Sequence, residues 1–144
     1  MLCEHMSPRF VRSRLSMSSL ASIRVLLCDD VQAFRALVRY SLEDEDGIEV
    51  VGEAADGNEG IRQATELQPD VILLDLSMPE CDGLEAISAI VRNSPRTQIV
   101  ALSGFTADRM AKPVIACGAT AYLEKGVDLS EVVATIRGVH AAAA

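Results

Sequence analysis

The hydrophobic positions along this chain follow two different periods. Five short aliphatic runs, bounded by polar or turn residues, have the length and composition of β-strands. They are Ile23–Cys28, Ile48–Ala54, Val71–Leu74, Gln98–Leu102 and Ala121–Glu124. The first, third and fourth runs are apolar on successive residues, which is typical of strands covered on both faces. The pattern therefore predicts a buried parallel sheet.

Between these runs, apolar residues recur at the three- and four-residue spacings of amphipathic helices. The expected inner stripes are Phe34, Leu37 and Val38; Ile61, Ala64 and Leu67; Leu84, Ile87 and Val91; and Leu129, Val132, Val133, Ile136 and Val139. Asp56-x-x-Glu59 and Asp128-x-x-Glu131 resemble capping boxes that open the second and fifth helices. The helical stripes alternate with the strands, which indicates repeated βα units.

A fourth helix is expected over about Thr106–Cys117, but Pro113 lies inside it. Proline lacks the N–H of a helical hydrogen bond and crowds the carbonyl of Arg109, so this helix should be short, kinked or late-starting. Five βα units with right-handed crossovers predict an α/β, flavodoxin-like (βα)5 fold. Its five-stranded parallel sheet should be doubly wound, in the order 2-1-3-4-5.

The length of 144 residues suits one domain. We expect residues 23–141 to form it, 142–144 to be a tail, and 1–22 to be a flexible N-terminal extension. The extension is rich in serine and arginine and has no apolar core of a secretion signal. It is interpreted as a loose tail or as the result of a start assigned too early, with Met17 as a candidate start; a transit peptide is the alternative.

Composition narrows the classes of function. Apolar residues make up 49% of the chain and aromatic residues 3%, so the core should be aliphatic. The net charge of −8 argues against nucleic-acid binding. The sequence contains no apolar run of about 18 residues, so no membrane span is expected. The four cysteines form no CxxC pair and have no histidine at metal-ligand spacing. They argue against zinc and for a reducing cytoplasm.

Residues with reactive side chains follow four of the five predicted strands. Asp29 and Asp30 follow the first, Asp75 the third, Ser103 the fourth and Lys125 the fifth. In doubly wound sheets, ligands bind at this carboxyl edge, near the point where the strand order reverses. Three neighbouring carboxylates repel one another unless a cation lies between them, and an all-oxygen set suits Mg²⁺. The sequence therefore predicts a magnesium site here.

Such a site is suited to phosphoryl transfer. A carboxylate can attack a phosphoryl group and form an acyl phosphate. The transfer depends on charge neutralisation and in-line positioning, which Mg²⁺ and Lys125 can supply, while the Ser103 hydroxyl can donate a hydrogen bond. The two histidines, His5 and His140, lie near the chain ends, and a carboxylate nucleophile needs no general base.

Taken together, these residues resemble the receiver domains of two-component response regulators. The resemblance rests on Asp29-Asp30, on Asp75 within VILLDLSMPECDGLEAI, on Ser103 within IVALSG and on Lys125 within CGATAYLEKG. It covers about Ile23–Val139. Any one of these pieces would be weak evidence, but the combined pattern is specific to this family.

The resemblance implies a role for each residue. Asp75 would be the phosphoacceptor, and the donor would be the phosphohistidine of a sensor histidine kinase or phosphotransfer protein. Asp29, Asp30, Asp75 and the backbone carbonyl of Ser77 would hold Mg²⁺. Ser103 and Lys125 would bind the phosphoryl group. Tyr122 would be the aromatic switch residue; the plainer interpretation makes it a half-buried strand residue.

The resemblance also implies how the protein would work. Phosphorylation would alter the face made by the fourth helix, fifth strand and fifth helix, for an unidentified downstream effector. A homodimer could form through the fourth and fifth helices. The protein would be a cytoplasmic signalling switch instead of an enzyme, with only self-phosphorylation and slow self-dephosphorylation chemistry.

Two segments, GIEVVGEAADGNEGI and ATAYLEKG, look most like the NarL-type branch of the family. Receivers of that branch normally precede a helix-turn-helix DNA-binding domain, but this sequence stops after the fifth helix, so that output is not carried over. The final alanine run favours a stand-alone domain, with the front part of a longer regulator as the alternative. Gly126 after Lys125 fits the branch, whereas Pro113 departs from the usual pattern.

Three other functions compete with this interpretation. A flavodoxin-like flavin binder needs a Ser/Thr/Gly-rich phosphate loop after the first strand, where Asp29 and Asp30 would repel phosphate. An aspartyl-phosphate hydrolase would need an acid two residues after the nucleophile, and that position is Ser77. A pseudo-receiver would bind a partner without phosphorylation, yet the acceptor, acidic pair, hydroxyl and lysine are all present.

Overall fold

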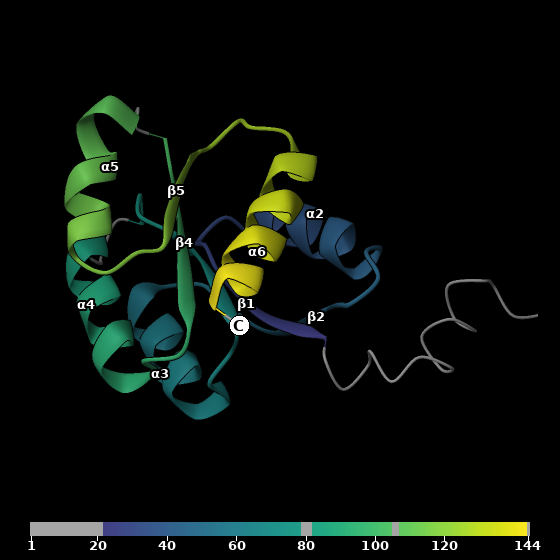
Figure 1. Cartoon of the computed structure of the whole chain (residues 1–144), viewed down its shortest axis with the longest axis horizontal. Coiled ribbons are helices and arrows are strands. Elements are labelled where there is room, and N and C mark those ends of the chain that lie inside the picture. Colours follow the sequence, from purple (N-terminus) through teal and green to yellow (C-terminus); the bar gives the residue numbers. More distant parts are fainter. Residues whose placement is uncertain (1–21, 79–81, 105–106, 144) are drawn as a thin grey trace, which may run out of the picture.

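The computed structural model describes residues 22–78, 82–104 and 107–143 (Figure 1). Strands and helices alternate along them. The elements are β1 (Ile23–Cys28), α2 (Gln32–Glu43), β2 (Ile48–Ala54), α3 (Gly57–Leu67), β3 (Val71–Asp75), α4 (Gly83–Asn93), β4 (Gln98–Ser103), α5 (Ala107–Ala116), β5 (Ala121–Glu124) and α6 (Leu129–Ala143). The prediction for the N-terminal extension falls, apart from Ser22, outside the described residues.

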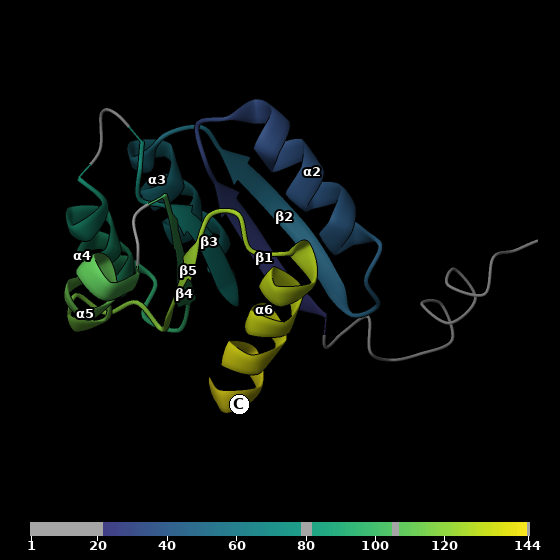
Figure 2. The same ribbon diagram turned by 90° about the horizontal axis from the view of Figure 1, so that it is seen from above.

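The five strands form one parallel sheet in the order β2-β1-β3-β4-β5. This confirms the predicted order and fold class. Helices α2 and α6 cover one face of the sheet, and α3, α4 and α5 cover the other (Figures 1 and 2). The order reverses between β1 and β3, so the carboxyl ends of these two strands border the crevice where such sheets bind ligands.

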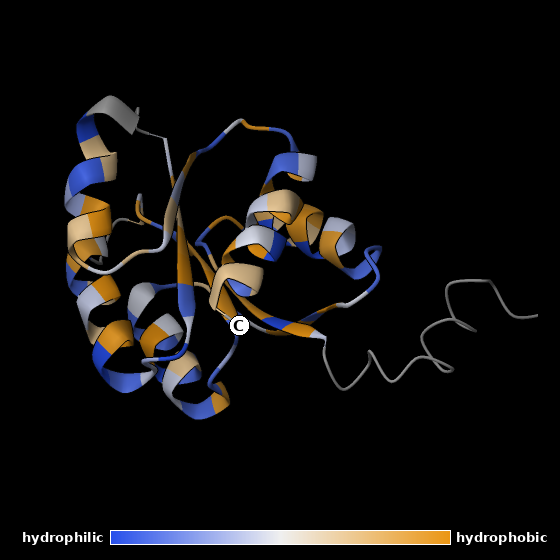
Figure 3. Ribbon diagram, viewed as in Figure 1, coloured by the Kyte–Doolittle hydropathy of each residue, from blue (hydrophilic) through white to orange (hydrophobic). Residues whose placement is uncertain are grey.

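Each face of the sheet has its own aliphatic core, because successive residues of a strand point to opposite faces. On β1, Val25 and Leu27 join the cluster under α2 and α6, whereas Leu26 and Cys28 join the cluster under α3, α4 and α5. All four are at most 2% exposed. Figure 3 shows the apolar colour continuing along the central strands, as the uninterrupted apolar runs predicted.

The predicted inner stripes are confirmed except at two positions. Leu37 is 53% exposed and Val91 is 39% exposed. On α2 the buried residues are Val38 and Leu42, so Leu37 lies one position outside the contact with the sheet. On α4 the buried face is centred on Ile87 and Ile90, which leaves Val91 at its margin. Helical periodicity gives the direction of a stripe but not its width.

The predicted cap of α3 is confirmed in one half. Asp56 is the N-cap residue, and its Oδ1 accepts the backbone N–H of Glu59 at 2.8 Å. The Glu59 carboxylate accepts a hydrogen bond from the Gln63 side chain at 2.9 Å. At α6, which begins at Leu129, the carbonyl of the preceding Asp128 accepts the N–H of Glu131 at 2.9 Å.

The fourth helix of the chain, α5, is short, as its proline predicted. It is 10 residues long with Pro113 inside it, and is the shortest of the described helices. Thr106, the expected first residue, lies outside the described residues. Strands β3 and β4 each extend one residue beyond the prediction, so Asp75 and Ser103 belong to the sheet itself. No helix in the described part of the chain is both long and apolar enough to cross a membrane.

Candidate functional site

Asp29 stands directly after β1, and the backbone around it fixes its carboxylate. Its N–H donates to the carbonyl of Ala54 at 3.0 Å, which continues the pairing of β1 with β2. Its Oδ1 accepts the N–H of Val31 at 2.8 Å, closing a turn that leads into α2. Asp29 is 4% exposed, whereas Asp30 is exposed. One acid of the pair is therefore buried in the site and the other faces solvent.

Asp75 is the last residue of β3 and is 1% exposed. The next residue, Leu76, donates its N–H to the carbonyl of Leu102 on β4 at 2.9 Å, so the chain stays paired past the acid. The Asp75 Oδ1 accepts the N–H of Ser77 at 2.8 Å. Its other oxygen, Oδ2, is thereby left facing the carboxyl edge.

Lys125, just after β5, bridges the two buried acids. Its Nζ lies 3.0 Å from Oδ2 of Asp29 and 3.1 Å from Oδ2 of Asp75. Its backbone N–H donates to the carbonyl of Ser103 at 2.7 Å, which fixes the lysine beside the end of β4. The sheet thus brings together Asp29, Asp75, Ser103 and Lys125, as their positions after the strands predicted.

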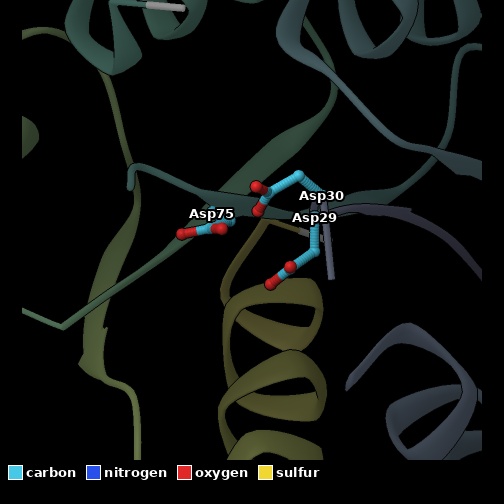
Figure 4. Close-up of side chains that lie close together, drawn as sticks. All are labelled: Asp29, Asp30 and Asp75. Atoms are coloured by element: carbon cyan, nitrogen blue, oxygen red, sulfur yellow. The ribbon is translucent and has the colours of Figure 1, made fainter. Parts of the chain in front are cut away.

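Three carboxylates gather at this edge. One oxygen each from Asp29, Asp30 and Asp75 can be chosen so that all lie within 4.8 Å of one another. Figure 4 shows the three side chains side by side, from the ends of β1 and β3. The Oδ2 atoms of Asp29 and Asp75 are buried and accept no well-formed hydrogen bond from the described residues. An all-oxygen, negatively charged set with such buried atoms fits a hard cation such as Mg²⁺.

The electrostatics of the two central groups agree with this fit. Burial raises the pKa of Asp75, and the charge of Asp29 adds to the rise; the Ser77 N–H and Lys125 oppose it without cancelling it. Burial by itself would lower the pKa of Lys125, but its close ion pairs with the Asp29 and Asp75 carboxylates outweigh this and raise it. The ammonium therefore stays charged at neutral pH, and one lysine faces three acids.

The remaining predicted residues surround this centre. Ser103 is fully buried at the end of β4. Ser77 is exposed, and its backbone lies next to Asp75 through the N–H bond. Tyr122 is half-buried on β5, opposite Ala101 of β4 and against the core under α5. The role of Tyr122 as a switch residue stays a prediction.

Two neighbours of the site were not anticipated from the sequence. The ring centroid of Phe34 lies 4.9 Å from Nζ of Lys125. Arg35 donates from its guanidinium to the carbonyl of Asp29, and its Nε lies 3.0 Å from Oε1 of Glu53. Periodicity had placed Phe34 on the inner face of its helix but gave no sign that this face meets a lysine far along the chain. No pattern in the sequence marked Arg35.

Comparison with known proteins gives the same picture. Residues 25–137 match the family model described as the response regulator receiver domain. The chain is 46% identical over 115 residues to the transcriptional regulatory protein LiaR of Bacillus subtilis, covering 80% of this chain and 54% of LiaR. It is 42% identical over 118 residues to the response regulator UvrY of Escherichia coli, covering 82% and 54%. The chain spans about half the length of these relatives.

Solved structures agree with the sequence relatives. A LuxR-family two-component response regulator from Aurantimonas has a TM-score of 0.79 at 30% identity, covering 84% of this chain and 86% of that one. The signal receiver domain of the putative response regulator NarL from Mycobacterium tuberculosis has a TM-score of 0.77 at 30% identity, covering 83% and 96%. The chain belongs to the receiver-domain family of two-component response regulators, in its NarL-type branch, a family of signalling switches whose general function is to accept a phosphoryl group.

Proposed function

We propose that Asp75 is the phosphoacceptor of this receiver and that Lys125, Ser103 and a bound Mg²⁺ assist the transfer. The observation that carries the proposal is the contact of the Lys125 ammonium with Oδ2 of Asp75, at 3.1 Å, inside a cluster of three carboxylates. A positive charge already lies beside the oxygen that has no hydrogen bond from the described residues. A phosphoryl group bonded to that oxygen would therefore lie beside the Lys125 ammonium.

The proposed donor is the phosphohistidine of a sensor histidine kinase or of a phosphotransfer protein. A carboxylate oxygen of Asp75 forms the new O–P bond while the P–N bond to the donor imidazole breaks, and the electron pair of that bond leaves with the imidazole. Lys125 neutralises one phosphoryl oxygen, and the Ser103 hydroxyl donates a hydrogen bond to another. No residue of the receiver has to remove a proton from the nucleophile, because the carboxylate attacks as an anion.

We assign the metal ligands to Asp29, Asp30, Asp75 and the backbone carbonyl of Ser77. The support is the all-oxygen chemistry of the set and the two buried Oδ2 atoms, which accept no well-formed hydrogen bond from the described residues and share one ammonium. When bound, Mg²⁺ would neutralise the charge that develops on the phosphoryl oxygens. Asp30 is the exposed member, so it is the ligand through which an ion from solvent would be captured.

Ser103 and Tyr122 are the proposed switch. Movement of the buried Ser103 toward a phosphoryl oxygen would open space into which the half-buried Tyr122 can turn, altering the face formed by α5, β5 and α6. An effector protein, or a second copy of the chain, would read that face. Slow loss of the phosphoryl group to water would reset it, without turnover of an external substrate.

The remaining parts of the proposal follow from the family and the charge. The working unit is residues 23–141, which contains the matched range 25–137. With a net charge of −8, the chain is proposed to act through protein partners and not to bind nucleic acid itself. We place it in the cytoplasm, where a reducing environment suits Cys28 and Cys117, which form no disulfide among the described residues.

The rival functions gain nothing from the site. A flavin phosphate after β1 would meet the Asp29 and Asp30 carboxylates, which repel it. A hydrolase of the aspartyl-phosphate type would need a carboxylic acid at position 77, where the chain has an exposed serine. The complete acceptor, acid pair, hydroxyl and lysine favour a phosphorylated receiver over a pseudo-receiver.

Intact-mass spectrometry tests the proposal directly. The wild-type chain, incubated with Mg²⁺ and a small acyl phosphate donor, should gain the mass of one phosphoryl group and lose it on treatment with hydroxylamine, which cleaves acyl phosphates. Asp75→Asn should gain nothing. Asp46→Asn, which removes a carboxylate from the loop before β2, is the matched control and should behave as wild type.

Equal mass gain in wild type and Asp75→Asn would show that the acceptor is misassigned. Omission of Mg²⁺ supplies a second arm. If phosphorylation proceeds equally fast with the metal chelated, the assignment of the three carboxylates as metal ligands is wrong even when Asp75 is the acceptor.

A further inference from the structure

We infer that Phe34 is a positioning residue for phosphoryl transfer: its aromatic face holds the Lys125 ammonium over the acceptor site. The inference rests on the proposed function, since it names a residue that acts on the same reaction through Lys125. It adds a side chain from α2, an element to which the reaction otherwise assigns no role.

The first support is the contact itself. The Lys125 Nζ lies 4.9 Å from the Phe34 ring centroid, within the range of about 6 Å over which a cation is attracted to the face of an aromatic ring. The lysine side chain is 25% exposed, and Phe34 packs against the core under α2 and α6. The ammonium is thus partly shielded from water, which strengthens its attraction to the ring.

The second support is what happens to the other contacts of Lys125 when the site works. Its ammonium touches Asp29 and Asp75. In the proposed function Asp29 binds the metal and Asp75 becomes an acyl phosphate, so both carboxylates change their charge distribution during the reaction. Among the described residues, the Phe34 ring is the other neighbour of the ammonium, and its charge distribution does not change in the reaction. It can therefore hold a flexible four-carbon side chain in place through the transfer.

The third support is the anchoring of Phe34. Its N–H and that of Arg35 both donate to the carbonyl of Val31, at 3.1 and 3.0 Å, forming the first turn of α2. The Arg35 guanidinium then ties this turn to the carbonyl of Asp29 and to Glu53 on β2. The ring therefore moves with the loop that carries the metal ligand, and its position relative to the acid cluster is fixed by the same bonds.

Three variants separate this role from simple packing. Phe34→Leu keeps an apolar side chain but removes the ring face, and Phe34→Tyr keeps the face. Val38→Ala, a buried position one turn further along α2, is the control for loss of core packing on the same helix. The probes are a small acyl phosphate with Mg²⁺, for the rate and its dependence on donor concentration, and proton NMR of the Lys125 ε-methylene without donor.

Phe34→Leu should slow phosphorylation about threefold to tenfold, the effect of losing one partly desolvated cation–ring contact. The loss should appear in the maximal rate more than in the donor concentration at half-maximal rate. In wild type and Phe34→Tyr, the ε-methylene protons should be shifted upfield by the ring, and that shift should vanish in Phe34→Leu. Phe34→Tyr should keep more than half of the wild-type rate, and Val38→Ala should keep both rate and shift.

Several results would overturn the inference. They are a wild-type rate in Phe34→Leu, an equal slowing in Val38→Ala, a failure of Phe34→Tyr to retain the rate, or no upfield shift in wild type. Normal phosphorylation that does not depend on Phe34 would remove this inference alone. Absence of any phosphorylation in wild type would remove the proposed function and this inference together.

Discussion

Replacing Asp75 with asparagine should stabilise the fold while abolishing phosphorylation. The carboxylate is 1% exposed, and it shares one lysine with the buried carboxylate of Asp29. Asparagine has nearly the same shape and can keep the acceptor for the Ser77 N–H. It removes only the charge. Lys125 then keeps an undivided ion pair with Asp29, at 3.0 Å.

The size of the effect follows from the distances. At an effective dielectric constant of about 20, two like charges at the 4.8 Å upper limit of the cluster repel by about 3 kcal/mol, and opposite charges 3.1 Å apart attract by about 5 kcal/mol. The Asp75 charge is repelled fully by the Asp29 charge and more weakly by the charge of the exposed Asp30, and it is attracted by the Lys125 ammonium. These nearly cancel, and the cost of burying the charge remains. We expect the substitution to raise the free energy of unfolding by about 1–2 kcal/mol, or the melting temperature by about 3–6 °C.

The gain should depend on pH in a definite direction. Burial raises the pKa of Asp75 above its ordinary value of 3.8. The folded state therefore binds this proton more tightly than the unfolded state does. The associated stability is fully present below pH 3.8 and is lost as the pH rises through the raised pKa. Wild type and Asp75→Asn should have similar stability in acid and should diverge toward neutral pH.

Thermal and urea unfolding, followed by circular dichroism in a chelator at several pH values, measures these differences. Glu49→Gln, at an exposed position of β2, removes one negative charge away from the site and controls for the change in net charge. The electrostatic reasoning is refuted if Asp75→Asn is less stable than wild type at pH 7 without divalent ions. A gain that persists undiminished at pH 3 would refute the assignment to the Asp75 charge.

Two further predictions concern the metal and the packing. Mg²⁺ should raise the melting temperature of the wild type, because the free energy of unfolding increases by about 1.4 kcal/mol for each tenfold excess of the ion over its dissociation constant. Asp30→Asn should respond more weakly to Mg²⁺ and should be no less stable than wild type in chelator. Equal responses of the two proteins in a Mg²⁺ titration would exclude Asp30 as a ligand. Gly60→Ala should lose about 1–3 kcal/mol, because its new Cβ would lie 2.6 Å from the Sγ of Cys28. Gly138→Ala, where the new Cβ meets nothing within 4 Å, should leave stability unchanged or raise it by up to about 1 kcal/mol. Denaturant unfolding of the two glycine variants measures the difference. A similar loss of stability at both positions would contradict the packing argument.

The sequence by itself determined the architecture and the location of the site. Runs that are apolar on successive residues can be buried only when both faces of a sheet are covered, and the helical stripes between them supply the cover. Once the strands are known to be parallel and in one sheet, the residues that follow each strand must lie at the carboxyl edge of that sheet. Asp29, Asp75 and Lys125 were therefore predicted as neighbours from their places in the chain, and in the structure the Lys125 ammonium lies within 3.1 Å of both carboxylates.

Only the tertiary structure decided which side chains touch across different elements. The exposure of Leu37 and Val91 depends on how far each helix rolls over the sheet, and a periodic pattern does not contain that angle. The contact of Phe34 with Lys125 requires the start of α2 and the end of β5 to lie close together at the carboxyl edge of the sheet. Local sequence sets the direction of a side chain from its own backbone, whereas a contact between distant segments also requires the position of the second backbone. That position is fixed only when the whole sheet is assembled.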